Sequence, residues 1–201
     1  MIENGVDLEK FAGAASTAPQ KTLVTIGRFS ANKQIPRVLD VLECLIDADP
    51  NWSLDIVGSP SDLTIEDLNS EIQERGLGNA VRVHVGLSDE QVREVVSKCS
   101  LFVSASEYEG FGIAMIEALS AGLLPIVHPN DAFRGLAGQH DSVCLTDFSR
   151  PKEAASAIDH SFERLLQAPE MRAAAMASAQ RHGWSSTLES YNDMYRCALG
   201  R

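Results

Sequence analysis

The chain has 201 residues, of which 44% are hydrophobic and 22% charged, and its formal net charge is −11 at pH 7. That length and composition fit one globular domain. The acidic balance argues against a nucleic acid or an anionic membrane surface as a direct partner of this domain. No signal peptide is recognisable, and no apolar run reaches the ~18 residues typical of a membrane-spanning helix.

Four cysteines, Cys44, Cys99, Cys144 and Cys197, lie far apart and show no Cys-x-x-Cys spacing. Because Cys44 and Cys99 fall in apolar helical patterns, we expect buried thiols and a cytoplasmic location, without disulfides or a cysteine metal site. The five histidines show no metal-ligand spacing either. Only His128, which follows a predicted strand, is placed where a ligand pocket is expected.

Taken in chain order, short apolar runs alternate with segments of helical periodicity. The predicted strands are residues 22–27, 53–58, 81–85, 101–103, 124–127 and 142–145. The predicted helices are residues 33–48, 63–75, 89–98 and 112–121, followed after Pro151 by 153–167, 169–181 and 184–199. Ser88 is the expected N-cap of the third helix, and 129–134 is expected to be a loop.

Strands that are apolar throughout, separated by amphipathic helices, indicate a parallel sheet covered on both faces. We therefore predict a doubly wound α/β domain with a six-stranded sheet at 21–183, preceded by a segment at 1–20 and followed by a helical extension at 184–201. In such sheets ligands bind beyond the carboxyl ends of the strands. The residues that follow each strand are therefore the candidates for a site.

The segment Ser106–Glu117 is the most informative of these. It places two carboxylates, Glu109 and Glu117, eight positions apart around Gly110-Phe111-Gly112, where a strand ends and a helix begins. The first N–H groups of a helix attract anions such as phosphate, whereas carboxylates accept hydrogen bonds from hydroxyl groups. Phosphate and hydroxyls together indicate a nucleotide-sugar. The alternative is a capping role for Glu109 and an exposed helix position for Glu117.

A second group follows the first predicted strand, where Gly27 is followed by Arg28 and Lys33. Arg28 offers a planar fork to phosphate oxygens and Lys33 a compact charge. With the amides of Gly112, Ile113 and Ala114 opposite, these cations would hold the two phosphates of a nucleoside diphosphate. The alternative is a pair of solvated surface cations.

These motifs resemble those of retaining glycosyltransferases with the two-domain GT-B fold, in particular family 4 (group 1). The Glu-x7-Glu pair, the Gly-Arg…Lys pair and Asn4-Gly5-Val6-Asp7 carry the resemblance, which covers only the C-terminal, donor-binding half of such an enzyme. It implies a missing N-terminal domain that binds the acceptor. Residues 1–20 would be the linker from that domain, and residues 184–201 would pack against it. It also implies metal-independent transfer of a hexose, so we expect no cofactor beyond the nucleotide-sugar substrate.

The resemblance assigns a role to each matching residue. Arg28 and Lys33 would contact the donor diphosphate and stabilise the charge that develops on it, Glu109 would face the transferred sugar, and Glu117 would bind the ribose hydroxyls. Gly110 and Gly112 would allow close approach of the backbone. Phe111 either packs beneath the sugar or belongs to the core, and Gly58 either lines the nucleotide pocket or makes an ordinary turn.

Two further positions remain open on the sequence. Residues 85–87 are expected near the base, without a side chain that separates guanine from uracil, and Ser106 is either a turn hydroxyl or a nucleotide contact. The pair Asp47 and Asp49 has the spacing of a metal-diphosphate motif, but it ends a helix at the opposite pole of the sheet, and no metal is expected there.

The segment after the motif helix departs from the usual Ala-x-Gly-x-Pro-Val pattern of the family, since it reads Ala121-Gly122-Leu123-Leu124-Pro125. These departures are similar to bacterial mannosyltransferases that extend polyprenyl-diphosphate-linked oligosaccharides for exopolysaccharide. That resemblance favours GDP-mannose over a UDP-sugar as donor and a lipid-linked or saccharide acceptor. It also places the enzyme at the inner membrane through the missing domain. The alternatives are a nucleotide-sugar epimerase of the same fold and a non-catalytic nucleotide-sugar sensor.

Overall fold

A computed structural model describes residues 4–199 and contains one parallel sheet of six strands in the order β3-β2-β1-β4-β5-β6. Each neighbouring pair of strands runs parallel, which confirms the predicted doubly wound sheet. The strands are β1 (Thr22–Ile26), β2 (Ser53–Gly58), β3 (Val81–Val85), β4 (Leu101–Ser104), β5 (Leu124–Val127) and β6 (Cys144–Leu145).

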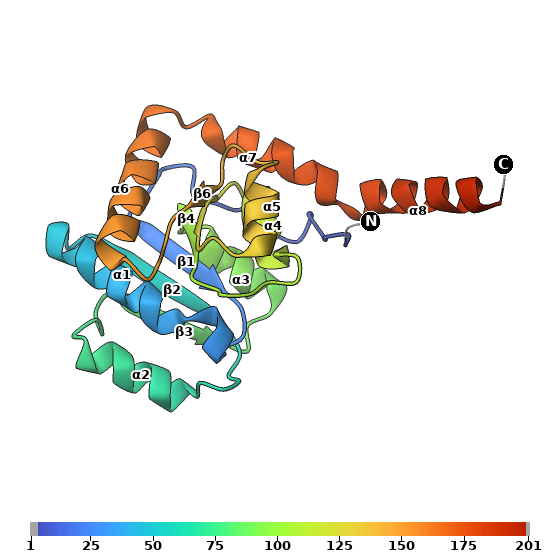
Figure 1. The fold of residues 1–201 in the computed structure, drawn as a ribbon. Coiled ribbons are helices and arrows are strands. Elements are labelled where there is room, and N and C mark those ends of the chain that lie inside the picture. The colour runs from blue at the N-terminus through green and yellow to red at the C-terminus, as the bar shows by residue number, and fades with distance from the viewer. Residues whose placement is uncertain (1–3, 200–201) are drawn as a thin grey trace.

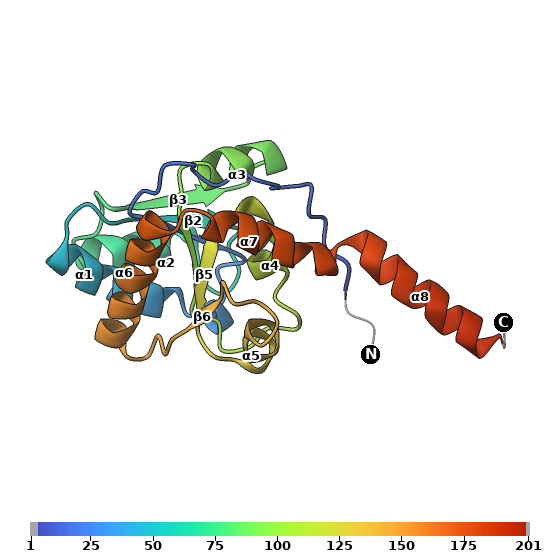
Figure 2. The same cartoon turned by 90° about the horizontal axis from the view of Figure 1, so that it is seen from above.

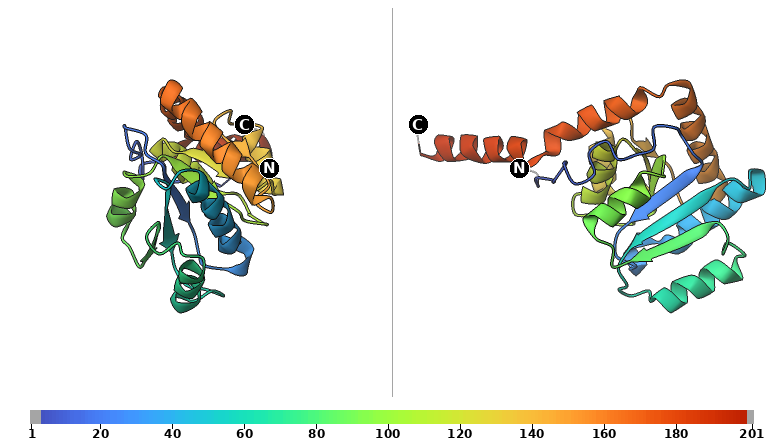
Figure 3. Two further views of the ribbon diagram at one scale, coloured as in Figure 1. Left: turned by 90° about the vertical axis from the view of Figure 1, so that its left-hand side faces the viewer. Right: turned by 180° about the vertical axis from the view of Figure 1, so that it is seen from behind.

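Helices cover both faces of this sheet (Figures 1 and 3). They are α1 (Ile35–Ala48), α2 (Ile65–Glu74), α3 (Asp89–Val96), α4 (Ile113–Ala121), α5 (Asp131–Ala137), α6 (Pro151–Gln167), α7 (Met171–Ala179) and α8 (Trp184–Ala198). Helix α6 packs on α1, and α7 packs on α4. Since the chain leaves β1 toward one edge and later returns toward the other, right-handed crossovers put α1 and α3 on opposite faces.

Local sequence signals set several helix boundaries. Thr64 and Ser88 each form a capping box at the start of α2 and α3, in which their hydroxyls accept hydrogen bonds from the amides of Asp67 and Gln91. Ser88 is thereby confirmed as an N-cap. Pro36 lies in the first turn of α1, where a missing N–H costs little.

The segment before β1 packs on the domain along most of its described length. Leu8 and Phe11 are buried, and Val6 forms a β-bridge with Gly183. The amides of Gly13 and Ala15 donate to the carbonyls of Ser120 and Ala121, at 3.0 and 2.8 Å. These bonds supply donors to carbonyls in the last turn of α4, which find no N–H donor within the helix. Residues 1–3 of the predicted linker lie outside the described part.

Helix α8 extends away from the sheet and its flanking helices (Figures 1 and 2). It carries exposed apolar side chains at Trp184, Leu188, Tyr191, Met194 and Tyr195. Spacings of three and four residues put most of them on one side of the helix. The predicted helical extension is present up to Ala198. Nowhere between residues 4 and 199 is a helix both long and apolar enough to cross a membrane.

Two local predictions were wrong. Residues 131–134 of the expected loop instead form the start of α5, because the side chain of Asn130 accepts a hydrogen bond from the Phe133 amide at 2.9 Å and caps the helix. The sixth strand is shorter than predicted and contains only Cys144 and Leu145. In addition, Cys99 is buried as expected, but Cys44 is only half-buried.

A buried carboxylate, Asp55 on β2, ties β2 to β3. Arg82 donates two hydrogen bonds to it at 2.8 Å each, and His84 Nε2 lies 2.7 Å from Asp55 Oδ1. Burial disfavours the charged form of Asp55, but the hydrogen bonds from Arg82 and His84 outweigh it, so the pKa of Asp55 is lowered.

We predict that Asp55→Asn lowers the free energy of unfolding at pH 7 by about 1.5–3 kcal/mol, the worth of a hydrogen bond to a charged group. Because the pKa of Asp55 is lower in the folded state, its stabilisation is complete above the unfolded value of about 3.9 and disappears as the pH falls through the folded value. Urea unfolding at several pH values measures both effects.

The control is Asp193→Asn, whose carboxylate makes an exposed ion pair with Arg196. Exposed pairs contribute little, so the free energy of unfolding should change by less than about 0.5 kcal/mol. Equal losses for Asp55→Asn and Asp193→Asn would contradict the structural role of Asp55.

Candidate functional site

A hollow of about 620 Å³ lies at the carboxyl ends of β1 and β4. These strands are neighbours at the point where the strand order reverses, which is where doubly wound sheets bind ligands. The hollow brings together the predicted residues Gly27, Arg28, Lys33, Glu109, Gly110, Phe111, Gly112, Ile113 and Glu117. The two cations and the two carboxylates, remote in sequence, therefore share one site.

At the centre of this hollow, Lys33 Nζ and Glu109 Oε1 form an ion pair at 2.7 Å. Their side chains retain only 22% and 17% of their exposure. An ammonium carries three N–H donors, so Lys33 can hold Glu109 and still donate to a phosphate oxygen. Arg28 lines the same hollow and is exposed, so its guanidinium is accessible to a ligand.

Asn32 aligns the two loops that carry this pair. Its side-chain Nδ2 donates to the Tyr108 carbonyl at 2.8 Å, and its Oδ1 accepts from the Tyr108 amide at 3.0 Å. The Asn32 carbonyl also accepts from the Glu107 amide at 3.1 Å. Asn32 precedes Lys33, and Tyr108 precedes Glu109, so these bonds fix the register of the two charged residues.

The turn into α4 requires glycine at position 112. Gly112 has φ +94°, which side chains other than glycine rarely adopt, and a Cβ there would lie 3.0 Å from Leu136 and 3.1 Å from Phe133. Both of those residues belong to α5. Helix α5 therefore packs directly behind the turn and supports it. Helical geometry leaves the amides of Ile113 and Ala114 directed to the hollow side of α4 without acceptors within the helix.

The loop between β4 and the turn is fastened from within. Asn130 donates its Nδ2 to the Ser106 carbonyl at 2.9 Å, and the hydroxyl of Ser106 lies 2.9 Å from that of Ser104. Ser106 is completely buried. Of the two roles left open by the sequence, the structure gives Ser106 that of a turn hydroxyl.

Glu117 lies one turn into α4, and its side chain retains 14% of its exposure. Lys10 Nζ, from the segment before β1, is 3.7 Å from its carboxylate. Burial raises the pKa of Glu117, although the charge of Lys10 opposes this change. A half-buried carboxylate at this place is suited to accept hydrogen bonds from hydroxyl groups of a ligand.

The remaining predicted residues fall into two groups. Phe111 lines the hollow and packs its ring edge against His182, with ring centroids 5.8 Å apart. Gly58, His128 and residues 85–87 do not belong to the lining. A Cβ on Gly58 would lie 1.8 Å from the Gly27 carbonyl, so this glycine allows the backbones after β1 and β2 to approach closely.

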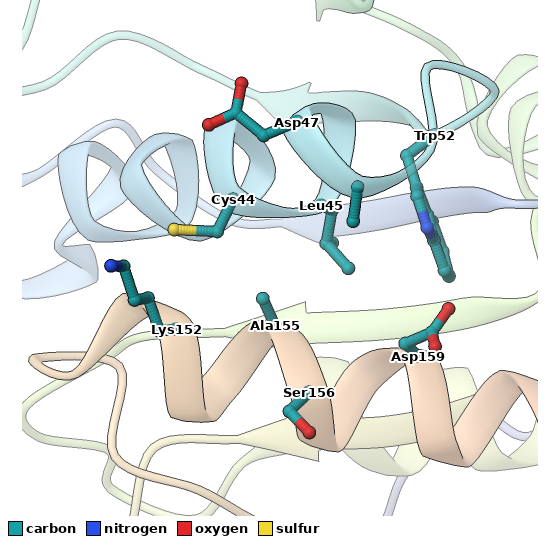
Figure 4. Close-up of a pocket in the computed structure, with 9 residues that line it drawn as sticks. Cys44, Leu45, Asp47, Trp52, Lys152, Ala155, Ser156 and Asp159 are labelled. Atoms are coloured by element: carbon teal, nitrogen blue, oxygen red, sulfur yellow. The ribbon is translucent and has the colours of Figure 1, made fainter.

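Another hollow, of about 460 Å³, lies between α1 and α6 (Figure 4). Trp52 and Ala155 contribute to its wall, and Asp47 points away from α6. Asp49 pairs with Lys21 at 2.9 Å. Among residues 4–199 no group of three or more His, Cys, Asp or Glu side chains is arranged to hold a metal ion.

The fold and the hollow together define a doubly wound α/β domain in which a helix N-terminus lies beside carboxylates at the place where such sheets bind ligands. The chain belongs to the family "Glycosyl transferases group 1", whose family model matches residues 8–182.

Two relatives within this family are named as mannosyltransferases. The chain is 36% identical to a GDP-mannose:cellobiosyl-diphosphopolyprenol alpha-mannosyltransferase from Xanthomonas oryzae pv. oryzae, with 100% of this chain and 53% of that protein covered. It is 31% identical to the protein of the same name from Komagataeibacter xylinus, over 100% and 51%. The chain therefore spans about half the length of these relatives.

Solved structures agree on the fold. TarM from S. aureus, solved with UDP, superposes with a TM-score of 0.82 at 20% identity over 97% of this chain and 39% of TarM. HepE from Anabaena, solved with UDP-glucose, gives 0.80 at 20% identity over 98% of this chain and 57% of HepE. At this identity the likeness establishes the GT-B type of domain and nothing more.

Sequence reasoning assigned no role to Asn4, Lys10 or Asn32. Asn4 lines the hollow. Lys10 pairs with the carboxylate of Glu117, and Asn32 binds the loop that carries Glu109. The only local signal is that Asn32 precedes Lys33. Its partner is 76 positions away, and no periodic pattern reveals such a pairing.

We predict that Asn32→Ala destabilises the protein by about 1–2 kcal/mol, because it removes two side-chain hydrogen bonds to the Tyr108 backbone. Urea unfolding followed by circular dichroism measures the loss. Asn69→Ala, on the exposed side of α2, is the matched control. It should be neutral or slightly stabilising, within about 0.7 kcal/mol. Indistinguishable unfolding curves for the two variants would show that Asn32 does not fasten the loops.

Proposed function

We propose that this chain is the donor-binding half of a retaining glycosyltransferase that takes a hexose from a nucleotide-sugar. The observation that carries the proposal is the shared hollow of Arg28, Lys33, Glu109 and Glu117 at the reversal of strand order. A nucleoside diphosphate hexose needs cations for its phosphates and acceptors for its hydroxyls. The hollow offers both, from the loops after β1 and β4 and from the first part of α4.

Each side chain has a defined role in this proposal. Arg28, Lys33 and the α4 amides bind the diphosphate and stabilise the negative charge that grows on it as the sugar leaves. Glu117 accepts hydrogen bonds from the ribose hydroxyls. Glu109, held by Lys33 at 2.7 Å, accepts from hydroxyls of the transferred sugar. Since cationic side chains and amides already oppose the diphosphate, the mechanism assigns no step to a metal.

For the donor we propose GDP-mannose, because the relatives at 36% and 31% identity are named as GDP-mannose-dependent mannosyltransferases. A UDP-sugar remains the second choice, since UDP is named with structural neighbours of the same fold. The same relatives' names support a polyprenyl-diphosphate-linked saccharide as acceptor.

We further propose that the acceptor binds on an N-terminal domain of a longer protein, since the relatives are about twice as long as this chain. The exposed apolar side of α8 supports contact with that domain, because unpartnered apolar side chains of this size favour burial. The four cysteines are free, which supports a reducing, cytoplasmic compartment. Access to a lipid-linked acceptor would bring the whole protein to the inner membrane.

Isothermal calorimetry with GDP and UDP tests the site. We predict that Arg28→Ala and Glu117→Ala each weaken binding of the favoured nucleotide by about 1.5–3 kcal/mol, the worth of a charged hydrogen bond. EDTA should leave the affinity unchanged. Thermal shift with GDP-mannose and UDP-glucose then identifies the donor, because a bound ligand raises the melting temperature.

The controls are Arg164→Ala and Glu163→Ala, two exposed positions on α6 away from the hollow. They should bind nucleotide as the wild type does. Unchanged affinity in Arg28→Ala and Glu117→Ala would contradict the assignment of the site.

Turnover by the full-length protein without transfer to an acceptor would favour an epimerase, and donor binding without any turnover would favour a sensor.

A further inference from the structure

We propose that Lys10 is a positioning residue for Glu117, holding its carboxylate ionised and oriented toward the ribose hydroxyls. This inference rests on the proposed function, since it concerns the nucleotide that the hollow would bind. Lys10 does not line the hollow itself. It would therefore act on a ligand indirectly, through the carboxylate of Glu117.

The geometry places Lys10 between two acidic side chains from different elements. Its Nζ lies 2.9 Å from Asp89 Oδ1, at the start of α3, and 3.7 Å from Glu117 Oε1, on α4. The same ammonium stands 4.9 Å from the centre of the Phe11 ring, whose side chain is buried. Asp89 and Phe11 thus hold the ammonium at a fixed distance from Glu117.

The charge balance at Glu117 shows why such a partner is needed. Burial raises the pKa of Glu117, and the nearby carboxylates of Asp89 and Asp7 act in the same direction. Lys10 is the cation that opposes them there. On the side of the hollow, the charged groups are Arg28, Lys33 and Glu109. For Lys10 burial acts in the opposite sense and tends to lower the pKa. Its two carboxylate partners, Asp89 and Glu117, outweigh this effect, so the pKa of Lys10 is raised and the side chain stays charged.

The consequence is chemical. An ionised carboxylate accepts hydrogen bonds from two hydroxyls at once, whereas a protonated one must give up part of that capacity. Because Lys10 favours the charged form of Glu117, removing it moves the pKa of Glu117 further up. Binding of a ribose should then begin to fail at a higher pH than in the wild type.

The test uses the full chain and two probes, GDP and 2′,3′-dideoxy-GDP, which lacks the ribose hydroxyls. Calorimetry compares the wild type, Lys10→Gln and Lys10→Arg between about pH 4 and pH 8, from the ordinary pKa of glutamate upward. Lys10→Gln should weaken GDP roughly fivefold at neutral pH, the size of a coupling between contacting residues. The loss should grow as the pH falls. Lys10→Arg should restore binding, and dideoxy-GDP should bind all three proteins equally.

A double variant separates positioning from general attraction of anions. In the Glu117→Gln background, Lys10→Gln should have no further effect on GDP affinity, because the group on which Lys10 acts is gone. Equal weakening of GDP and dideoxy-GDP by Lys10→Gln would show that Lys10 attracts only the diphosphate, and would overturn the inference. So would a Lys10→Gln variant whose pH profile matches the wild type. Failure of the wild type to bind either GDP or UDP would instead overturn the proposed function, and the inference with it.

Discussion

The parallel pairing of β1 with β4 is the constraint on which the site depends. Leu23 and Val24 lie opposite Leu101 and Phe102, so both strands end at the same edge of the sheet. From β1 the chain proceeds to β2 and β3 on one side of β1, and it then crosses to β4 on the other side. The loops after these two strands are therefore forced together, which puts Lys33 beside Glu109 across 76 positions of sequence.

Helix α4 is held at both ends, and this makes it a fixed support for a ligand. Its start is set by Gly112, packed against α5. Its end is closed by the amides of Gly13 and Ala15 and by the buried Arg172 of α7, which donates to the Gly122 carbonyl at 2.9 Å. The first amides of α4 and the carboxylate of Glu117 thus keep one geometry, as the proposed nucleotide site requires. The acidic net charge of −11 matters little here, because the cations that face the hollow act at short range.

Much of the fold follows from patterns that are local in the sequence. The apolar runs of β2, β3 and β5 have the bounds that the periodicity predicts. Ser88 caps α3 because a hydroxyl three residues before Gln91 can close a capping box. The motif around Glu109 and Glu117 could also be found, since it lies within one strand–turn–helix unit. The start of α5 was missed because its capping residue, Asn130, follows Pro129, and Asn after Pro is equally typical of a turn.

The sequence by itself therefore determined the alternation of strands and helices, the parallel sheet and the two charged motifs. Tertiary structure alone decided which loops meet. Only strand order brings Asn32 to Tyr108, and only the return of the first segment over α4 brings Lys10 within 3.7 Å of Glu117. The physical reason is that periodicity and capping act within a few residues, whereas contacts across 76 or more positions depend on how the whole core packs.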